Sequence, residues 1–163
     1  ADERFRTVVH PLLEVAGEIV SSSHIRGLVL AGEVAEANRL LGTAFQLQGE
    51  VAHGDERGRE LGFPTANIVP EEALACPGHG VYACLADGCP AAVSIGVRPT
   101  FKTGRGELIE AYVLDFDGDL YGSEMRLDFL QRLRGERRFD SPETLIEQMH
   151  RDVERTREIA EAL

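Results

Sequence analysis

The residues best suited to chemistry form one segment, 53–67, which reads HGDERGRELGFPTAN. Glycines recur in it every four residues, at Gly54, Gly58 and Gly62. A glycine-rich loop lets backbone N–H groups approach phosphate oxygens, and Arg57 and Arg59 can neutralise the phosphate charge. The segment has neither the G-x-x-x-x-G-K-[ST] nor the G-x-G-x-x-G pattern of two common nucleotide-binding loops. By themselves these residues leave two interpretations open, a phosphate-binding loop and a solvated charged turn, and favour the second.

The end of the same segment, Pro-Thr-Ala-Asn, adds two oxygen-bearing side chains. In an extended stretch Thr65 and Asn67 point to the same face, because successive strand side chains alternate. A hydroxyl and an amide oxygen are hard ligands that suit Mg²⁺, which completes its coordination shell with phosphate oxygens and water. The alternative is an ordinary polar strand face.

A third candidate is Glu110, which lies in the apolar stretch LIEAYVLDF. If this stretch is a strand, Glu110 shares a face with Leu108 and Tyr112. A carboxylate among apolar neighbours is either a structural group with satisfied hydrogen bonds or a general base held in a pocket. The residues alone do not choose between the two.

The elements that would position these residues are mostly strands. Short stretches between residues 45 and 134 alternate or run apolar, and Gly, Pro or Asp-Gly separate them: 45–53, 80–86, 90–97, 107–116 and 123–130. The sequence FDGDLYG, residues 116–122, has the composition of a hairpin turn. Consecutive strands without intervening helices predict an antiparallel barrel or sandwich.

Helices are expected at both ends of the chain. A serine run at 21–23 predicts a helix start, Gly32 divides the following segment into two short helices, and Gly42 ends the second. Residues 141–162 predict a long helix that begins with Ser141 and Pro142. We therefore expect a small helical segment at 1–43 and a second domain at 44–163.

Composition excludes several classes of protein. Lys and Arg total 17 against 28 Asp and Glu, a net charge of −11, so we expect no binding to nucleic acid or to an anionic membrane through bulk charge. No apolar run is long enough to span a bilayer, and no secretory signal is expected. Three cysteines without a C-x-x-C pair fit reduced thiols, which predicts a cytoplasmic protein.

Several motifs together resemble one known family, the riboflavin kinases. They are HGDERGRELGFPTAN, GVYAC, SIGVRPTF, IEAYVLDFDGDLYG and LRGERRFDSPETL, in this order. The resemblance covers about residues 44–160 and is greatest to the C-terminal kinase module of bacterial bifunctional riboflavin kinase/FAD synthetases. The stretch VSSSHIRGLVLAGEVAEANRLLG, within 1–43, resembles the tail of the adenylyltransferase domain and the linker that precede this module.

The resemblance implies a mainly β fold, a six-stranded antiparallel Greek-key barrel with a long C-terminal helix. It also implies ATP-dependent phosphorylation of riboflavin to FMN, with release of ADP and a requirement for Mg²⁺. By the same resemblance Glu110 is the catalytic base, and Arg134 and Tyr112 contact the flavin. Thr65 and Asn67 hold the metal and bind ATP together with the loop residues Gly54, Arg57, Gly58 and Arg59.

One departure from the family pattern limits the expected activity. The His-containing nucleotide motif of the adenylyltransferase domain is absent from the chain, so we expect no FAD synthesis. Ser21 to Ser23 and Arg26 resemble a later phosphate-binding motif of that domain, separated here from its partners. Two alternatives remain, a module that binds flavin without turnover and a module that needs an adenylyltransferase domain from a longer parent chain.

Overall fold

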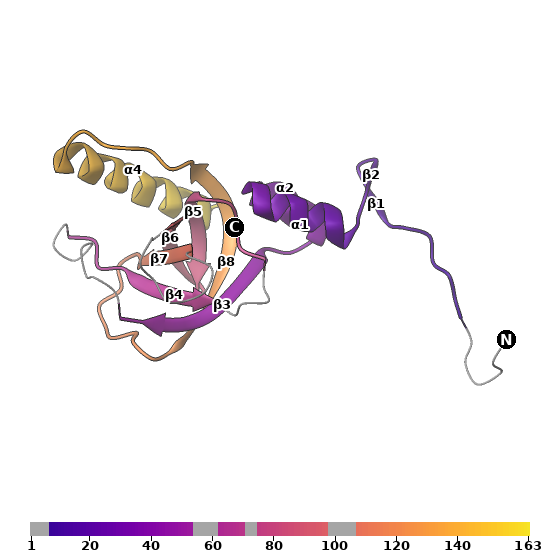
Figure 1. Cartoon of the computed structure of the whole chain (residues 1–163), viewed down its shortest axis with the longest axis horizontal. Coiled ribbons are helices and arrows are strands. Elements are labelled where there is room, and N and C mark those ends of the chain that lie inside the picture. Colours follow the sequence, from indigo (N-terminus) through magenta and orange to yellow (C-terminus); the bar gives the residue numbers. More distant parts are fainter. Residues whose placement is uncertain (1–6, 54–61, 71–74, 98–106) are drawn as a thin grey trace.

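Six antiparallel strands form the centre of the molecule (Figure 1). The computed structural model describes residues 7–53, 62–70, 75–97 and 107–163, and within these the strands close into a barrel. The strands are β3 (Phe45–Ala52), β4 (Ala66–Pro70), β5 (Gly80–Ala86), β6 (Cys89–Val97), β7 (Glu107–Val113) and β8 (Glu124–Arg134). Their order around the barrel is β3-β4-β7-β6-β5-β8, with β8 also paired to β3. The prediction of a six-stranded antiparallel barrel is confirmed.

The barrel interior holds the main hydrophobic core. Because strand side chains alternate, every second residue points inward, and in β7 these are Ile109, Ala111 and Val113. The largest fully buried side chains include Tyr82 and Phe129, whose rings meet edge to face at 5.4 Å. The alternation also turns the polar residues of β7 outward, and this decides where Glu110 lies.

The hairpin predicted for residues 116–122 is wrong. Strands β7 and β8 follow each other in the chain, but β7 pairs with β4 and β6, and β8 with β3 and β5. Both edges of β7 are therefore occupied, and the connection crosses to the other side of the barrel. It is fixed on β3, where the Val51 N–H donates to the Ser123 carbonyl at 2.9 Å and the Gly122 N–H donates to the Val51 carbonyl at 2.9 Å.

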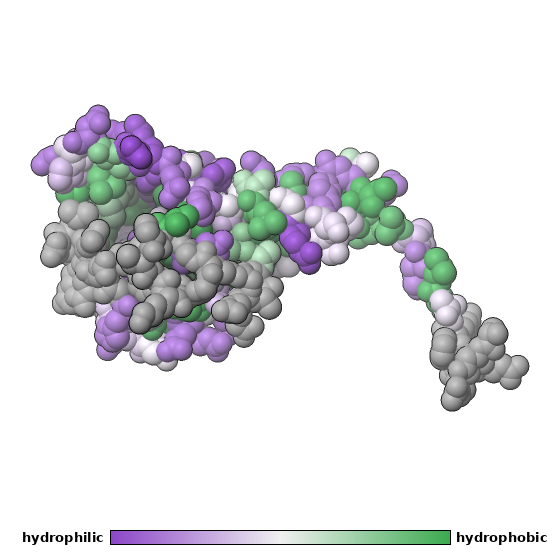
Figure 2. Space-filling model, viewed as in Figure 1, coloured by the Kyte–Doolittle hydropathy of each residue, from purple (hydrophilic) through white to green (hydrophobic). Residues whose placement is uncertain are grey.

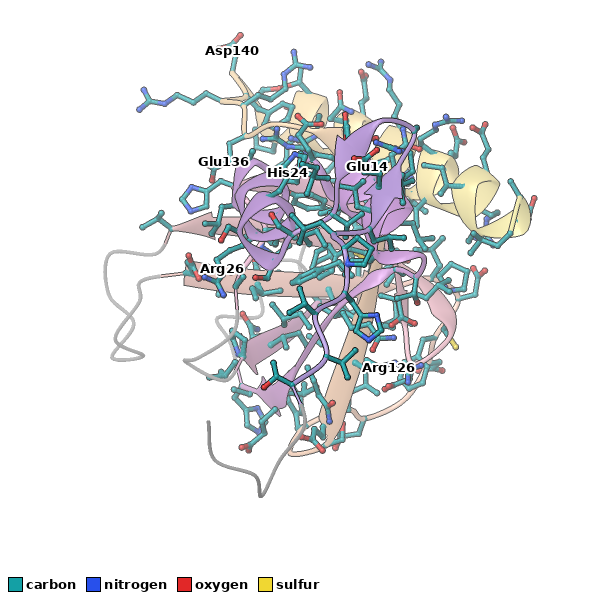
Figure 3. All side chains as sticks on the ribbon, turned by 90° about the vertical axis from the view of Figure 1, so that its right-hand side faces the viewer. Glu14, His24, Arg26, Arg126, Glu136 and Asp140 are labelled. Carbon is teal, nitrogen blue, oxygen red and sulfur yellow. The ribbon has the colours of Figure 1, made fainter. Side chains whose placement is uncertain are left out.

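Two short helices pack against one side of the barrel, as Figures 1 and 3 show. They are α1 (Ser22–Ala31) and α2 (Val34–Leu41), and the predicted caps are present. Ser21 Oγ accepts from the His24 N–H at 3.2 Å, while Gly32 and Gly42 end the helices in the left-handed conformation. The division into two helices at Gly32 is thus confirmed. Preceding them, β1 (Glu14–Val15) and β2 (Glu18–Ile19) form a small antiparallel pair.

Specific contacts join these helices to the barrel. The Asn38 side chain donates to the Phe129 carbonyl at 2.7 Å and accepts from the Phe45 N–H at 2.7 Å. The Gly78 N–H donates to the Val29 carbonyl at 3.1 Å. The tail of the helical segment is therefore ordered against the barrel, while the domain boundary at 43/44 stays a prediction.

The long C-terminal helix α4 (Pro142–Glu161) lies across the outside of the barrel (Figure 1), and its edge away from the barrel is mainly hydrophilic (Figure 2). It begins as predicted: Ser141 caps the helix, Thr144 completes a capping box, and Pro142 occupies the first turn. The apolar residues that recur along α4 at helical spacing are only half-buried: Ile146, Met149, Val153 and Ala160. The buried residues of α4 are the polar Asp152 and Thr156. Among the helices of the described residues, none combines the length and apolar character needed to cross a membrane.

Candidate functional site

Three polar residues stand side by side on the outer surface of the barrel. Strand pairing aligns Asn67 of β4 with Glu110 of β7, and Glu110 with Ser94 of β6. Directly opposed residues of antiparallel strands point to the same face, with their Cβ atoms about 5 Å apart. Since Ile68 and Ile109 point into the core, this row points outward. The barrel thus places the predicted base beside a predicted metal ligand.

Asn67 is unusual within this row. It is only 6% exposed, and its Oδ1 atom has no hydrogen-bond partner among the described residues. A buried acceptor without a hydrogen-bond partner lowers the stability of the fold, and a bound ion that contacts the oxygen would explain why it is there. The oxygen is of the kind that Mg²⁺ accepts, so the residue fits the predicted metal. No cluster of three or more His, Cys, Asp or Glu side chains suited to a metal occurs within the described residues.

Thr65 lies immediately before β4, in the wall of a pocket of about 560 Å³ at one end of the barrel. The pocket is bounded by the start of β4, by the ends of β3 and β7, and by the connection that follows β7. Its lining residues are Val51, Pro64, Thr65, Ala66, Ala111, Val113, Phe116, Asp117, Gly118, Asp119, Leu120 and Tyr121. The segment interpreted as a hairpin turn is therefore one wall of a pocket that is large enough to hold part of a nucleotide.

Two aromatic rings stack beside this pocket. The His53 and Tyr121 ring centroids are 3.8 Å apart, with 22° between the planes. His53 is the first residue of the 53–67 segment, and this stacking places it beside the pocket wall. The predicted phosphate-binding residues Gly54, Arg57, Gly58 and Arg59 lie outside the described residues, and their role stays a prediction.

The predicted flavin contact Tyr112 lies on the same outward face of β7 as Glu110, two residues away, and is half-buried. Its ring meets Phe63 at 5.3 Å, and Phe63 meets His150 of α4 at 5.0 Å, both edge to face. Phe63 is buried and directly precedes Pro64 and Thr65. An aromatic row therefore connects the Glu110 face of the barrel with α4. Sequence reasoning missed Phe63 and His150, because only the fold brings α4 to this face.

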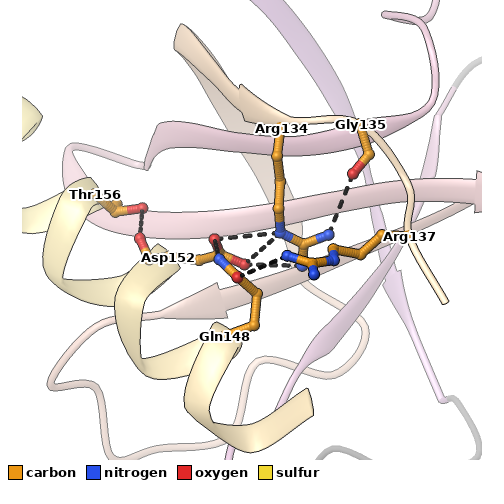
Figure 4. A network of polar contacts seen from close by, with 6 residues as sticks. All are labelled: Arg134, Gly135, Arg137, Gln148, Asp152 and Thr156. Atoms are coloured by element: carbon orange, nitrogen blue, oxygen red, sulfur yellow. Dashed lines mark hydrogen bonds and ion pairs between the residues drawn. The ribbon is translucent and has the colours of Figure 1, made fainter. Parts of the chain in front are cut away.

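Arg134, the other predicted flavin contact, lies at the end of β8 and is bound to α4 (Figure 4). Its Nε and Nη2 atoms lie 2.9 and 2.8 Å from Asp152 Oδ2. The structure thus places Arg134 apart from the row of Asn67 and Glu110, in an ion pair that the sequence analysis did not predict. Its contact with the flavin stays a prediction.

The three cysteines are weaker candidates for chemistry than the residues described above. Burial raises the pKa of the Cys84 thiol, which keeps it protonated, and the nearby Asp128 carboxylate adds to the effect. Cys76 is also buried, and Cys89, the first residue of β6, is exposed. No cysteine joins the Asn67–Glu110 row.

Comparison with known proteins shows similarity to one family over most of this chain. The family model described as "Flavokinase: Riboflavin kinase" matches residues 41–160. A bifunctional riboflavin kinase/FMN adenylyltransferase of Listeria monocytogenes is 40% identical over 161 residues, which cover 96% of this chain and 51% of that protein. The protein of the same name from Escherichia coli K12 is 39% identical over 147 residues, 87% of this chain and 46% of its own length. The chain thus spans about half the length of these relatives.

Two solved structures share the fold. A riboflavin kinase from Trypanosoma brucei superposes with a TM-score of 0.55 and 26% identity, covering 73% of this chain and 81% of that chain. A chain from Streptococcus pneumoniae, described as a macrolide-efflux protein, superposes with a TM-score of 0.83 and 36% identity. That match covers 92% of this chain and 50% of that one.

Proposed function

Because this chain belongs to the riboflavin kinase family, we propose that it transfers the γ-phosphoryl group of ATP to the 5′-hydroxyl of riboflavin, giving FMN and ADP. The observation that carries the proposal is the strand register that sets Glu110 beside Asn67. This register puts a carboxylate next to an unpartnered, buried amide oxygen. Phosphoryl transfer uses a group that accepts the proton of the alcohol, and ligands for the metal ion that offsets the charge of the phosphates.

Glu110 is the proposed general base. Its carboxylate accepts the proton of the riboflavin 5′-hydroxyl as the oxygen attacks the γ-phosphorus and the bond to the ADP oxygen breaks. The half-buried position of Glu110 on a rigid strand favours this role, because a base must be held within hydrogen-bond reach of the proton that it accepts.

Thr65 and Asn67 are the proposed metal-binding and phosphate-binding residues. When bound, Mg²⁺ supplies positive charge that stabilises the phosphate oxygens of ATP. The chain's part is to present the Thr65 hydroxyl at the pocket wall and the Asn67 amide oxygen two residues further along. The pocket between Thr65 and the 116–121 segment is the proposed nucleotide site, with the loop residues Gly54, Arg57, Gly58 and Arg59 as further ATP contacts.

The proposed flavin site lies on the Glu110 side of β7, where Tyr112 and Phe63 offer aromatic surface near α4. Planar ring systems pack well against such edge-to-face pairs. Arg134, which forms an ion pair with Asp152 of α4, is the proposed polar partner of the flavin. The proposed location of the reaction is the cytoplasm, where the free cysteines of this chain stay reduced.

Two other functions must be separated from this one: flavin binding without turnover, and a kinase that works only with an adenylyltransferase domain from a longer parent chain. The relatives in Listeria monocytogenes and Escherichia coli carry both activities in their names and are about twice as long. We expect no FAD from this chain alone, because the sequence lacks the nucleotide motif of that second activity.

The test is a reaction of the purified chain with riboflavin, ATP and MgCl₂, followed by chromatography with fluorescence detection of riboflavin, FMN and FAD. We expect FMN without FAD. Glu110→Gln should lower kcat about 10²- to 10⁴-fold, the usual contribution of a positioned base, and keep riboflavin affinity. Absence of FMN with the unaltered chain would contradict the proposal, and a riboflavin titration would then distinguish a flavin binder from an idle module.

A further inference from the structure

A polar network ties the end of β8 to the middle of α4 (Figure 4). The Asp152 carboxylate pairs with the Arg134 guanidinium, and the Gln148 amide donates to Asp152 Oδ1 at 2.9 Å. Arg137, three residues beyond Arg134, donates to Gln148 Oε1 at 3.4 Å. Each acceptor of the buried carboxylate is thus occupied, and the network reaches from the helix into the segment that follows β8.

The network holds a charge where a helix normally buries apolar side chains. Asp152 is 6% exposed, and Thr156, also buried, donates its hydroxyl to the Asp152 carbonyl at 2.8 Å. A buried ion pair contributes little net stability in comparison with apolar residues of the same size. A role in fixing the geometry of Arg134 is therefore a better explanation of this pair than stability is.

The guanidinium of Arg134 keeps some binding capacity in this arrangement. Arginine has five N–H donors. The Nε–H donates to Asp152, Nη2 lies 2.8 Å from Asp152 Oδ2 in the ion pair, and one N–H of Nη1 donates to the Gly135 carbonyl at 3.2 Å. One N–H on each Nη atom is left over by the contacts among the described residues. The guanidinium also lies 5.6 Å from the centre of the Phe139 ring, a second contact besides the ion pair.

The same turn of α4 meets the other proposed part of the flavin site. His150, which lies between Gln148 and Asp152 in the sequence, contacts Phe63 and through it Tyr112 on the Glu110 face. One helical turn therefore contacts both residues that flank the proposed flavin site, Tyr112 through the aromatic row and Arg134 through the ion pair.

We propose that Asp152, supported by Gln148, is a positioning residue that orients Arg134 for binding of riboflavin. This inference rests on the proposed function. It assigns to α4 a role in substrate specificity besides its packing against the barrel. Asp152 itself need not touch the substrate, because it acts through the direction in which it holds the two remaining N–H donors.

The test compares steady-state constants of Asp152→Asn, Arg134→Gln and the double variant. We expect Asp152→Asn to raise KM for riboflavin about five- to tenfold, with KM for ATP changed less than twofold. In the Arg134→Gln background the same substitution should add less than a twofold effect, because residues that act through one contact are not additive. Glu158→Gln is the matched control, since it removes one exposed acidic charge from the same helix and should change neither constant.

Three outcomes would overturn the inference while leaving the kinase proposal intact: an unchanged KM for riboflavin in Asp152→Asn, an equal rise in both KM values, or full additivity with Arg134→Gln. If Asp152→Asn does not fold, Gln148→Leu replaces it, because this variant removes one contact of the carboxylate and keeps the ion pair. It should raise KM for riboflavin two- to threefold, and an unchanged KM contradicts the inference. Absence of FMN with the unaltered chain would contradict the kinase proposal instead, and riboflavin fluorescence quenching would then compare the same variants.

Discussion

Replacing Asn67 with leucine should stabilise the fold and impair catalysis at the same time. Leucine has the same branching and the same number of heavy side-chain atoms as asparagine, and it removes the amide oxygen that is buried without a partner among the described residues. Leaving a buried acceptor unsatisfied costs about 1–3 kcal/mol, and this cost disappears with the substitution. A residue kept at the expense of stability is expected where a ligand needs it.

The magnitudes follow from the position of Asn67. Since it lies on the outer face of the barrel, we use the lower end of that range and expect the free energy of unfolding to rise by about 1 kcal/mol. For a chain of this length such a change raises Tm by about 2–4 °C. Loss of one contact to a charged group, worth about 1.5–3 kcal/mol, should reduce kcat/KM about ten- to a hundredfold or more.

Two assays check this prediction: thermal unfolding followed by circular dichroism, and FMN formation measured over a range of Mg²⁺ concentrations. Ser94→Ala is the control, because Ser94 flanks Glu110 on the other side and is exposed, so both readouts should stay near those of the unaltered chain. An Asn67→Leu variant that is less stable than the unaltered chain and fully active would refute the reasoning, since Asn67 would then be a structural residue with no ligand.

Three further predictions concern the metal site, the helical segment and a surface ion pair. Thr65→Ala should raise the Mg²⁺ concentration for half-maximal FMN formation; an unchanged titration removes Thr65 as a ligand. Gly32→Ala should cost more stability than Gly42→Ala in urea unfolding: both sites have positive φ, but only at Gly32 would the new Cβ meet the Tyr82 hydroxyl, at 2.7 Å. The left-handed conformation costs each variant about 1–2 kcal/mol, and the added contact should cost Gly32→Ala about 1 kcal/mol more; equal losses would exclude the contact. The hydrogen bond from Arg157 lowers the pKa of Asp115 below its ordinary value of 3.8, so the pair stabilises the fold above about pH 4 and the effect is lost as the pH falls through the lowered pKa. The Tm advantage of the unaltered chain over Asp115→Asn should therefore shrink below pH 4, and a constant difference would contradict this.

The local residue pattern of the chain was sufficient to predict most of the helices and strands. The alternation of apolar and polar residues located five of the strands, and serine and glycine marked the ends of α1, α2 and α4. That Glu110 shares a face with Leu108 and Tyr112 also followed from alternation alone, whereas the outward direction of this face came from the barrel. These features depend on contacts between near neighbours in the chain, and a sequence specifies such contacts directly.

The local residue pattern did not predict the order of the strands in the barrel. The composition of residues 116–122 favours a tight turn, but β7 already has partners on both edges, so the segment becomes a pocket wall beside Thr65 instead. The pairing of Asn67 with Glu110 likewise needs β4 and β7 to be neighbours, which residue spacing does not reveal.

Local residue patterns therefore predict most of the helices and strands, the family resemblance and the residue types that could carry phosphoryl transfer. Which distant residues meet depends on how the strands and helices pack: Asn67 with Glu110, Phe63 with His150, and Arg134 with a buried Asp152. The periodicity of α4 predicts an apolar inner face, yet its buried residues are Asp152 and Thr156. The physical reason is that a buried charge is tolerated only where a partner from elsewhere in the chain neutralises it, and that partner is supplied by the fold.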